Sequence, residues 1–303
     1  MAVDVVGVGL AVVDLKVTVS SIPQIEETVL AFDFHKHHGG PVGNALVTLQ
    51  RLGMRTQYMG MLGNDEYGTM IAEGMKAEGV DTSSLRLADG ENTPFSIVMV
   101  DAHTKKRSIA FHAGCALSVP ADCIDTNAIK SAKLLHVDFC TPAVRAACEA
   151  AKEAGVPISV DADGLYPGLE EILEMATVFV PAREIASQLV GEDDPARAAE
   201  LIRRKYDLDV VTVTRGKEGS VSVTPEGAIS VPGFEIEPLD TTGAGGVYQG
   251  AYLYGYLNSW PVARTARFAN AAAALMCSGM NGWADIPTLD KVKTFLKQRG
   301  AEK

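Results

Sequence analysis

The sequence contains few of the features that mark membrane-spanning or nucleic-acid-binding proteins. No uninterrupted apolar run reaches the roughly 18–20 residues that a transmembrane helix needs. Its 303 residues include 27 Lys and Arg against 38 Asp and Glu, a formal net charge of −11 that argues against binding along a nucleic-acid backbone. A small anionic ligand is still compatible with this charge, because backbone N–H groups can hold an anion.

Cysteine is also scarce, and it shows no paired pattern. The five cysteines are Cys115, Cys123, Cys140, Cys148 and Cys277. Their wide spacing favours buried thiols in a reducing environment over a disulfide framework or a zinc site. The first residues include no basic region and reach Asp4 and Asp14 early, which is not typical of a signal peptide. We therefore expect a cytoplasmic protein without a membrane partner.

The body of the chain has the composition and the pattern of a folded α/β protein. Hydrophobic residues make up 47% and charged residues 21%, enough apolar surface to offset the entropy of ordering. Apolar runs alternate with helical patterns five or more times, which predicts a doubly wound, mostly parallel sheet. Strands are expected at 3–10, 57–62, 134–138, 158–161, 178–180 and 210–214. Helices are expected at 43–52, 67–78, 142–154, 169–175, 194–205, 247–258 and 261–276.

Two stretches interrupt this alternation. Residues 15–38 and 95–112 alternate apolar and polar side chains without an intervening helix, as strands exposed on one face do. We interpret them as a small antiparallel β lid inserted into a single α/β domain that spans residues 1–303. Exposed edges of such a lid favour pairing with a second copy, so a homodimer is expected.

The segment most informative about chemistry runs from Leu239 to Tyr248. Its small residues Gly243, Ala244, Gly245 and Gly246 precede an expected helix and follow a β-rich stretch at 229–236. Unobstructed N–H groups at a helix start form a site for a phosphoryl group or a developing oxyanion. Taken alone, the four residues also fit a flexible turn, since glycine loops are common.

Several motifs together resemble those of the PfkB-type, ribokinase-like carbohydrate kinases. Asp240-Thr241-Thr242-Gly243-Ala244-Gly245 is similar to the family's carboxyl-terminal signature D-T-x-G-A-G-D. Gly39-Gly40-Pro41-Val42-Gly43-Asn44 resembles its sugar-binding segment G-G-x-x-x-N. Further similarities, in the expected order, are Asp14, residues 60–68, residues 214–219, and residues 269–287.

The resemblance implies an ATP-dependent kinase with a sugar or sugar-like alcohol as acceptor. It implies that substrate binds at Asp14, Gly39, Gly40, Asn44 and Asp138. It implies that the nucleotide lies along Thr214, Gly216, Gly219, Thr241 and Asn270. The terminal phosphate would then lie over the amides of residues 243–246.

Two departures from the family pattern affect catalysis and metal binding. The last Asp of the signature is the family's catalytic base, and this chain has Gly246 there. An engineered inactivation, another carboxylate as base, or a binding protein without catalysis would each explain the change, so a non-catalytic sugar- or nucleotide-binding regulator is the alternative function. The N-x-x-E motif is also incomplete, because Pro181 stands where Asn would align with Glu184.

Other carboxylates are therefore candidates for the cation sites. Asp161 and Asp163 could hold Mg²⁺ directly or through water, although capping a strand end explains them equally well. Asp240 is a candidate for a monovalent cation such as K⁺. His35, His37 and His38 are not expected to bind a metal, because strand alternation divides them between two faces. One of them, with Lys36, could contact an anionic group on the acceptor.

Overall fold

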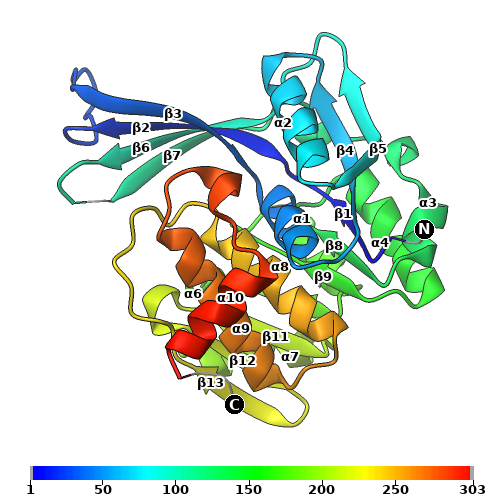
Figure 1. The fold of residues 1–303 in the computed structure, drawn as a ribbon. Helices are drawn as coiled ribbons and strands as arrows, with labels where there is room; N and C mark the ends of the chain where they lie inside the picture. Colours follow the sequence, from blue (N-terminus) through cyan, green and yellow to red (C-terminus); the bar gives the residue numbers. More distant parts are fainter. Residues whose placement is uncertain (1–2, 105, 301–303) are drawn as a thin grey trace.

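The computed structural model of the chain describes residues 3–104 and 106–300, and its largest element is a nine-stranded sheet (Figure 1). Its strands are β1 (Val5–Val8), β4 (Thr56–Gly63), β5 (Asp81–Ala88), β8 (Leu134–Val137), β9 (Ile158–Val160), β10 (Val178–Phe179), β11 (Val210–Thr214), β12 (Ser220–Thr224) and β13 (Gly227–Val231). They are ordered β13-β12-β11-β10-β9-β8-β1-β4-β5. Neighbours from β11 to β5 pair in parallel, and β12 and β13 add an antiparallel hairpin at one edge.

Helices cover both faces of this sheet, as a doubly wound α/β fold requires. They are α1 (Pro41–Arg51), α2 (Glu66–Ala77), α3 (Thr126–Ser131), α4 (Pro142–Ala154), α5 (Leu169–Leu173), α6 (Arg183–Val190), α7 (Pro195–Tyr206), α8 (Ala244–Leu257), α9 (Val262–Cys277) and α10 (Leu289–Gln298). One apolar core joins the sheet to α3–α7, and the other joins it to α1, α2 and α8–α10. All four residues of β1 are buried between these layers, which explains its unbroken apolar run.

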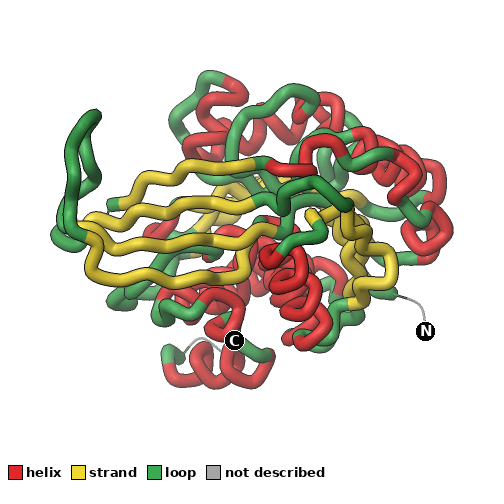
Figure 2. The backbone as a smooth tube through the Cα atoms, turned by 90° about the horizontal axis from the view of Figure 1, so that it is seen from above, coloured by secondary structure: helices red, strands yellow, loops and turns green. Residues whose placement is uncertain are grey.

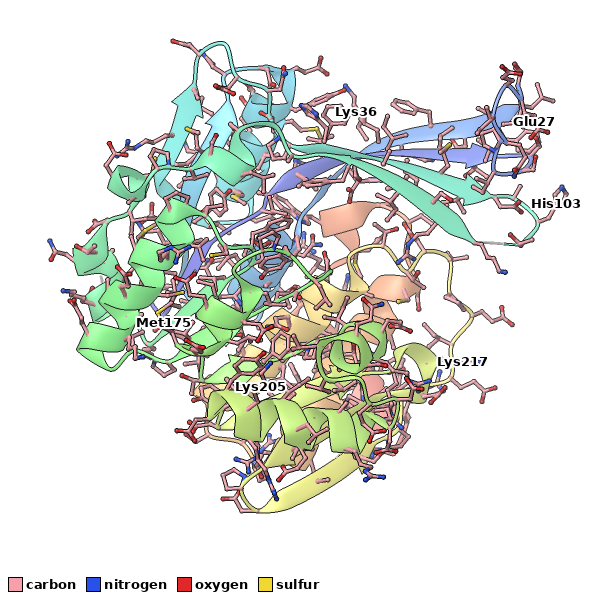
Figure 3. The ribbon with its side chains drawn as sticks, turned by 180° about the vertical axis from the view of Figure 1, so that it is seen from behind. Glu27, Lys36, His103, Met175, Lys205 and Lys217 are labelled. Carbon is pink, nitrogen blue, oxygen red and sulfur yellow. The ribbon has the colours of Figure 1, made fainter. Side chains whose placement is uncertain are left out.

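A second sheet projects from the body as the predicted lid. It comprises β2 (Val12–Val19), β3 (Ala31–Gly39), β6 (Phe95–Asp101) and β7 (Arg107–His112), in the order β3-β2-β6-β7. Its two outer pairs are antiparallel, and β2 and β6 join them through a parallel pairing. Figure 2 shows the four strands side by side, and Figure 3 places Glu27 and His103 at their far end.

Pairing register divides the lid residues between two faces. Asp14 pairs with His37 and Ser96, and Lys16 pairs with His35 and Val98, so these side chains share a face. Apolar side chains alternate with them on the opposite face: Leu15, Val17, Phe34, Ile97 and Met99. His35 and His37 therefore share one face while Lys36 and His38 lie on the other, as the alternation predicts.

Most of the expected helices and strands are present, with ends within a few residues of the predicted ones. Several differences are informative. Helix α8 starts at Ala244, three residues earlier than predicted, so the small residues are its first turn. The β-rich stretch predicted at 229–236 is strand only up to Val231. The sequence predicted neither the strands β5 and β12 nor the helices α3, α6 and α10. No helix among the described residues has the length and hydropathy to cross a membrane, and the cytoplasmic location stays a prediction.

Candidate functional site

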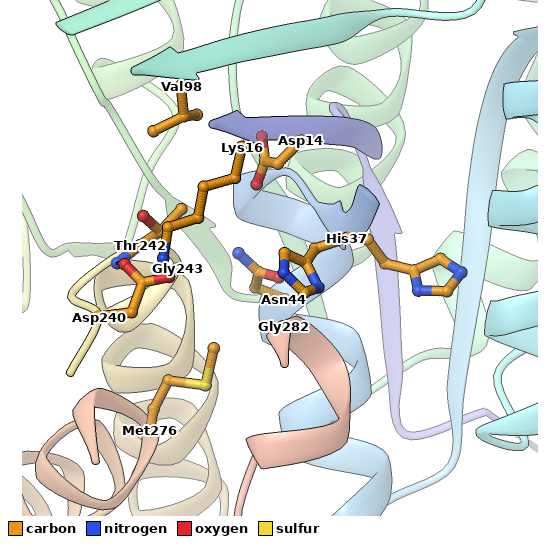
Figure 4. A pocket seen from close by; sticks show the side chains of 11 residues that line it. Asp14, Lys16, His37, Asn44, Val98, Asp240, Thr242, Gly243, Met276 and Gly282 are labelled. Atoms are coloured by element: carbon orange, nitrogen blue, oxygen red, sulfur yellow. Dashed lines mark hydrogen bonds and ion pairs between the residues drawn. The ribbon is translucent and has the colours of Figure 1, made fainter. Parts of the chain in front are cut away.

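A cleft lies between the lid and the start of α8, and Figure 4 shows the side chains that line it. The cleft is narrow in this structure, with a cavity volume of about 20 Å³. The lid contributes Asp14, Lys16, His37, His38 and Val98. The body contributes Asn44, Asp240, Thr242, Gly243, Met276 and Gly282. The cleft thus joins the two motifs that the sequence separates by about 200 positions.

The start of α8 presents free backbone donors at this cleft. Gly243 precedes the helix in the left-handed region, at φ 79°, where glycine is favoured. The N–H of Ala244 donates to Thr241 O at 3.3 Å, and that of Val247 donates to Gly243 O at 3.1 Å. Within the described residues this leaves the N–H groups of Gly245 and Gly246 for a ligand, beside the positive end of the helix dipole.

Gly245 lies in open space, whereas Gly246 is tightly packed. A Cβ added at Gly245 would have no heavy atom within 4 Å, so this residue faces open space. At Gly246 it would lie 2.7 Å from Asn44 Cβ and 2.9 Å from the carbonyl oxygen of Pro41. Helix α8 is therefore packed against α1 at a spacing that only glycine permits at position 246.

Asp14 is fixed at the lid side of the cleft. It accepts a hydrogen bond from Ser96 Oγ, and an added Cβ at Gly39 would lie 2.2 Å from its Oδ2. Burial, together with the nearby charges of Asp240 and Asp163, raises the pKa of Asp14 to about 6. Gly39 thus provides the room for this carboxylate, and a hydroxyl-bearing ligand would meet an acceptor there.

A hydrogen bond fixes the orientation of the Asn44 side chain. Trp283 Nε1 donates to Asn44 Oδ1 at 2.8 Å, and both side chains are buried. With its oxygen engaged, the Asn44 amide nitrogen is directed towards Gly243, where an added Cβ would lie 3.1 Å from it. His38 stacks on Trp283 with ring centroids 4.5 Å apart. Asn44 therefore offers a donor, not an acceptor, to the cleft.

Two cationic side chains of the lid reach the Gly-rich motif. Lys16 Nζ lies 2.8 Å from Asp240 Oδ2, and Figure 4 shows the side chain extending to that carboxylate. Arg107, on β7, donates to Thr241 Oγ1. The Lys16 ammonium and the N–H of Thr242 hold the pKa of Asp240 below its usual value in spite of burial. These contacts connect the lid to the turn before α8.

Three predicted carboxylates lie outside the lining of the cleft, namely Asp138, Asp161 and Asp163. Asp138 accepts from the N–H of Leu10 at 2.8 Å and lines a separate small cavity beside Phe139. Burial raises the pKa of Asp138 to about 8. Burial and the neighbouring charges of Asp163 and Asp138 also raise the pKa of Asp161. Among the described residues no group of three His, Cys, Asp or Glu side chains forms a metal site.

The predicted nucleotide residues also lie outside the cleft lining. Gly216 and Gly219 belong to the turn between β11 and β12, which follows Thr214 at the end of β11. An added Cβ at Gly219 would lie 2.2 Å from the carbonyl oxygen of Val231, so glycine allows this turn to pack on β13. The buried amide of Asn270 donates to the carbonyl groups of Val231 and Pro232 at 3.3 Å each. Asn270 therefore ties α9 to the end of β13.

Glu184 and Lys36 also lie outside the lining of the cleft. Glu184 is exposed in the first turn of α6. Lys36 forms an ion pair with Glu66 of α2 on the outer face of the lid. The hypothesis that Lys36 contacts an anionic acceptor group is therefore wrong, because its side chain points away from the cleft.

Sequence reasoning missed Lys16, Trp283 and Arg107 as residues of this site. Lys16 follows Asp14 by two positions on an alternating strand, and this spacing was sufficient to place both on one face. Trp283 and Arg107 carried no comparable signal, since their partners Asn44 and Thr241 lie far away in the chain.

The chain is similar in sequence to known carbohydrate kinases. The family model described as pfkB family carbohydrate kinase matches residues 3–289. The 5-dehydro-2-deoxygluconokinase of Clostridium beijerinckii is 26% identical, with 99% of this chain and 94% of the relative covered. The ATP-dependent ribose-1-phosphate kinase of Halopiger xanaduensis is 28% identical over 94% of this chain and 95% of its own length.

Among solved structures, the ribokinase of Arabidopsis thaliana complexed with ribose and ATP superimposes with a TM-score of 0.85. It is 25% identical, and the match covers 98% of this chain and 99% of that one. The large sheet, the helical layers and the lid are thus one ribokinase-like fold.

Proposed function

The chain belongs to the pfkB family of carbohydrate kinases, and we propose that it transfers the terminal phosphoryl group of ATP to a hydroxyl group of a sugar or sugar-like alcohol. The observation that carries this proposal is the start of α8, where free amides border a cleft that also contains Asp14 and Asn44. The relatives are named for a sugar acid, a sugar phosphate and a neutral sugar, so their names leave the charge of the acceptor open.

In this proposal the acceptor lies under the lid. Asp14 accepts hydrogen bonds from its hydroxyl groups, and the oriented Asn44 amide donates to one of its oxygens. A hydroxyl oxygen of the sugar attacks the terminal phosphorus, the bond from that phosphorus to the β,γ-bridging oxygen breaks, and ADP leaves. The hydroxyl proton passes to solvent or to an oxygen of the transferred phosphoryl group. The amides of Gly245 and Gly246 stabilise the charge on the transferred group, which is the main contribution a protein makes to phosphoryl transfer.

Gly246 has no side chain that could accept the hydroxyl proton. Loss of a general base costs typically about 10²–10⁴-fold in rate, so we propose that transfer in this chain is slow. The close packing of α8 on α1 at Gly246 favours, as the second candidate, a ligand-binding protein on the kinase fold. In that case the site retains the sugar and loses the chemistry.

The candidate ligands for a cation are carboxylate oxygens. Mg²⁺ is usually held by one or two carboxylates together with substrate phosphates, and the oxygens of Asp161 and Asp163 fit that role, with Glu184 a weaker candidate. When bound, Mg²⁺ supplies charge neutralisation on the phosphates. Asp240 does not offer a free charge to K⁺, because the Lys16 ammonium already occupies its carboxylate. We therefore leave K⁺ out of the proposal.

We also propose that two copies pair through their lids. Phe34 is 59% exposed and Ile97 is 39% exposed on the face that points away from the cleft. An apolar sheet face of this kind is typical of an interaction surface. A second copy of the chain presents the same face and would cover it symmetrically.

The kinase proposal is tested by ADP release in a coupled assay with Mg²⁺–ATP and a panel of sugars, sugar acids and sugar phosphates. Acceptor-dependent ADP release above the rate with ATP alone supports it. Titration calorimetry of nucleotide and of each acceptor separates the alternatives. Sugar binding without measurable ATP binding would contradict the kinase and favour the binding protein.

A further inference from the structure

The lid face that covers the cleft carries a lysine where a neutral ligand needs none. Lys16 is 4% exposed, and burying an ammonium group is costly unless it is paired. Its Nζ has three N–H donors, and the described contacts give it one partner, Asp240. The ammonium group thus keeps donor capacity directed into the cleft.

A ring nitrogen on the same lid face also has no partner, and it donates in the neutral tautomer that carries the proton on Nε2. His37 Nε2 is buried and makes no hydrogen bond with the described residues, although burying such a group unpaired is unfavourable. Register places His37 opposite Asp14, on the same lid face as Lys16. The amide nitrogen of Asn44 approaches from the opposite wall of the cleft, held by Trp283.

Val98 and Met276 add apolar surface to the lining of the cleft. In such surroundings a charged hydrogen bond is stronger than in water. Asp240 Oδ2 receives one of the three ammonium N–H donors while its Oδ1 accepts from the N–H of Thr242 at 2.9 Å, so the ion pair leaves Lys16 two further N–H donors. An added anion could therefore share the ammonium without displacing the carboxylate.

We propose that the acceptor sugar carries a carboxylate or phosphate group, and that Lys16 and His37 of the lid bind this group while Asp14 binds its hydroxyls. This inference rests on the proposed function, because it names the substrate class of the same site. An anionic group is an acceptor only, so it satisfies Lys16 and His37 together, whereas a hydroxyl group would bring its own donor. Arg107 adds a positive charge on the same lid face near Thr241.

The test uses matched pairs of probes that differ in charge. D-gluconate is compared with D-glucitol, and ribose 1-phosphate with ribose, by calorimetry in the presence of Mg²⁺ and a non-hydrolysable ATP analogue. We expect at least one anionic probe to bind ten times more tightly than its neutral counterpart. The gluconate and ribose 1-phosphate arms then distinguish a carboxylate from a phosphate ligand.

Three variants assign the effect to the lid lysine. K16M should weaken the anionic probe by 10–100-fold and change the neutral probe by less than threefold, and K16R should restore most of the loss. K36M is the matched control, because Lys36 lies on the opposite face of the same sheet. Melting temperature and nucleotide affinity, measured on each variant, show whether it is folded.

Each outcome has a defined meaning. Neutral probes that bind as tightly as the anionic ones, or K16M affecting both equally, would overturn the inference. So would the absence of binding by every anionic probe. Phosphoryl transfer to a neutral sugar would overturn the inference and keep the kinase proposal, whereas a failure to bind nucleotide would count against the kinase itself.

Discussion

An aspartate at position 246 should increase the rate of phosphoryl transfer and decrease the stability of the fold. In Gly246→Asp the new side chain begins in the first turn of α8, beside the free amides, where a base could reach an acceptor hydroxyl. We expect kcat to increase by about 10²–10⁴-fold, the usual contribution of general-base catalysis. Gly246→Ala adds the same Cβ without a carboxylate, so it is the matched control.

The structural cost comes from the space between α8 and α1. The new Cβ would lie 2.7 Å from Asn44 Cβ, so the helices must separate until the two carbons reach roughly 3.5–4 Å. Overpacking of this kind costs about 1–3 kcal/mol. Replacing a helical glycine returns roughly 0.5–1 kcal/mol, and an acidic residue at a helix start adds about 0.3–1 kcal/mol. We therefore expect Gly246→Ala to be destabilised by about 0–2.5 kcal/mol and Gly246→Asp by at most about 2 kcal/mol.

The assay is coupled ADP release, with thermal unfolding measured in parallel. Turnover that increases in Gly246→Asp but not in Gly246→Ala supports the role assigned to this position. Equal turnover in the native chain and in a folded Gly246→Asp protein would refute it. A rise in Gly246→Ala would show instead that helix spacing, and not a base, limits the reaction.

Three further predictions concern other parts of the molecule. Trp283→Phe removes the hydrogen bond to Asn44, worth about 1 kcal/mol, so KM for the acceptor should rise about fivefold with little change in kcat; an unchanged KM would contradict the positioning role. Burial lowers the pKa of His136 to about 4, so the folded state binds fewer protons than the unfolded state below about pH 6.5. The contribution of His136 to stability should therefore fall by roughly 3 kcal/mol between pH 6.5 and 4, measured in urea as the difference between the native and His136→Leu unfolding free energies; a difference that does not change with pH would contradict this. Phe34→Glu should separate the proposed lid dimer in light scattering, and a native chain already monomeric at micromolar concentration would contradict the dimer.

How much of this could be predicted from the sequence depends on the range of the interaction. Local periodicity predicted α4 and β11 with their observed ends, because a Pro start and a Gly stop, or a run of Val and Thr, are encoded within the element. The motif similarity placed Asp14, Asn44 and Gly243 at one site, and the structure brings them around one cleft.

The contacts between distant segments could not be predicted in the same way. Nothing near Asn44 in the chain indicates that Trp283 fixes its amide, and nothing near Gly246 indicates how closely α8 packs on α1. Asp138 has a strand-end position that suggests ligand contact, yet its carboxylate is directed to the backbone of Leu10. Such roles follow from how the elements pack, which the pattern of a single segment does not contain.

The central claim is that the start of α8 holds the terminal phosphate of ATP beneath the lid. A crystal structure with Mg²⁺ and a non-hydrolysable ATP analogue tests it most directly. The account predicts the γ-phosphate within hydrogen-bond distance of the Gly245 and Gly246 amides, facing Asp14 and Asn44 across the cleft. A nucleotide bound elsewhere, or a terminal phosphate that contacts neither amide, would contradict it.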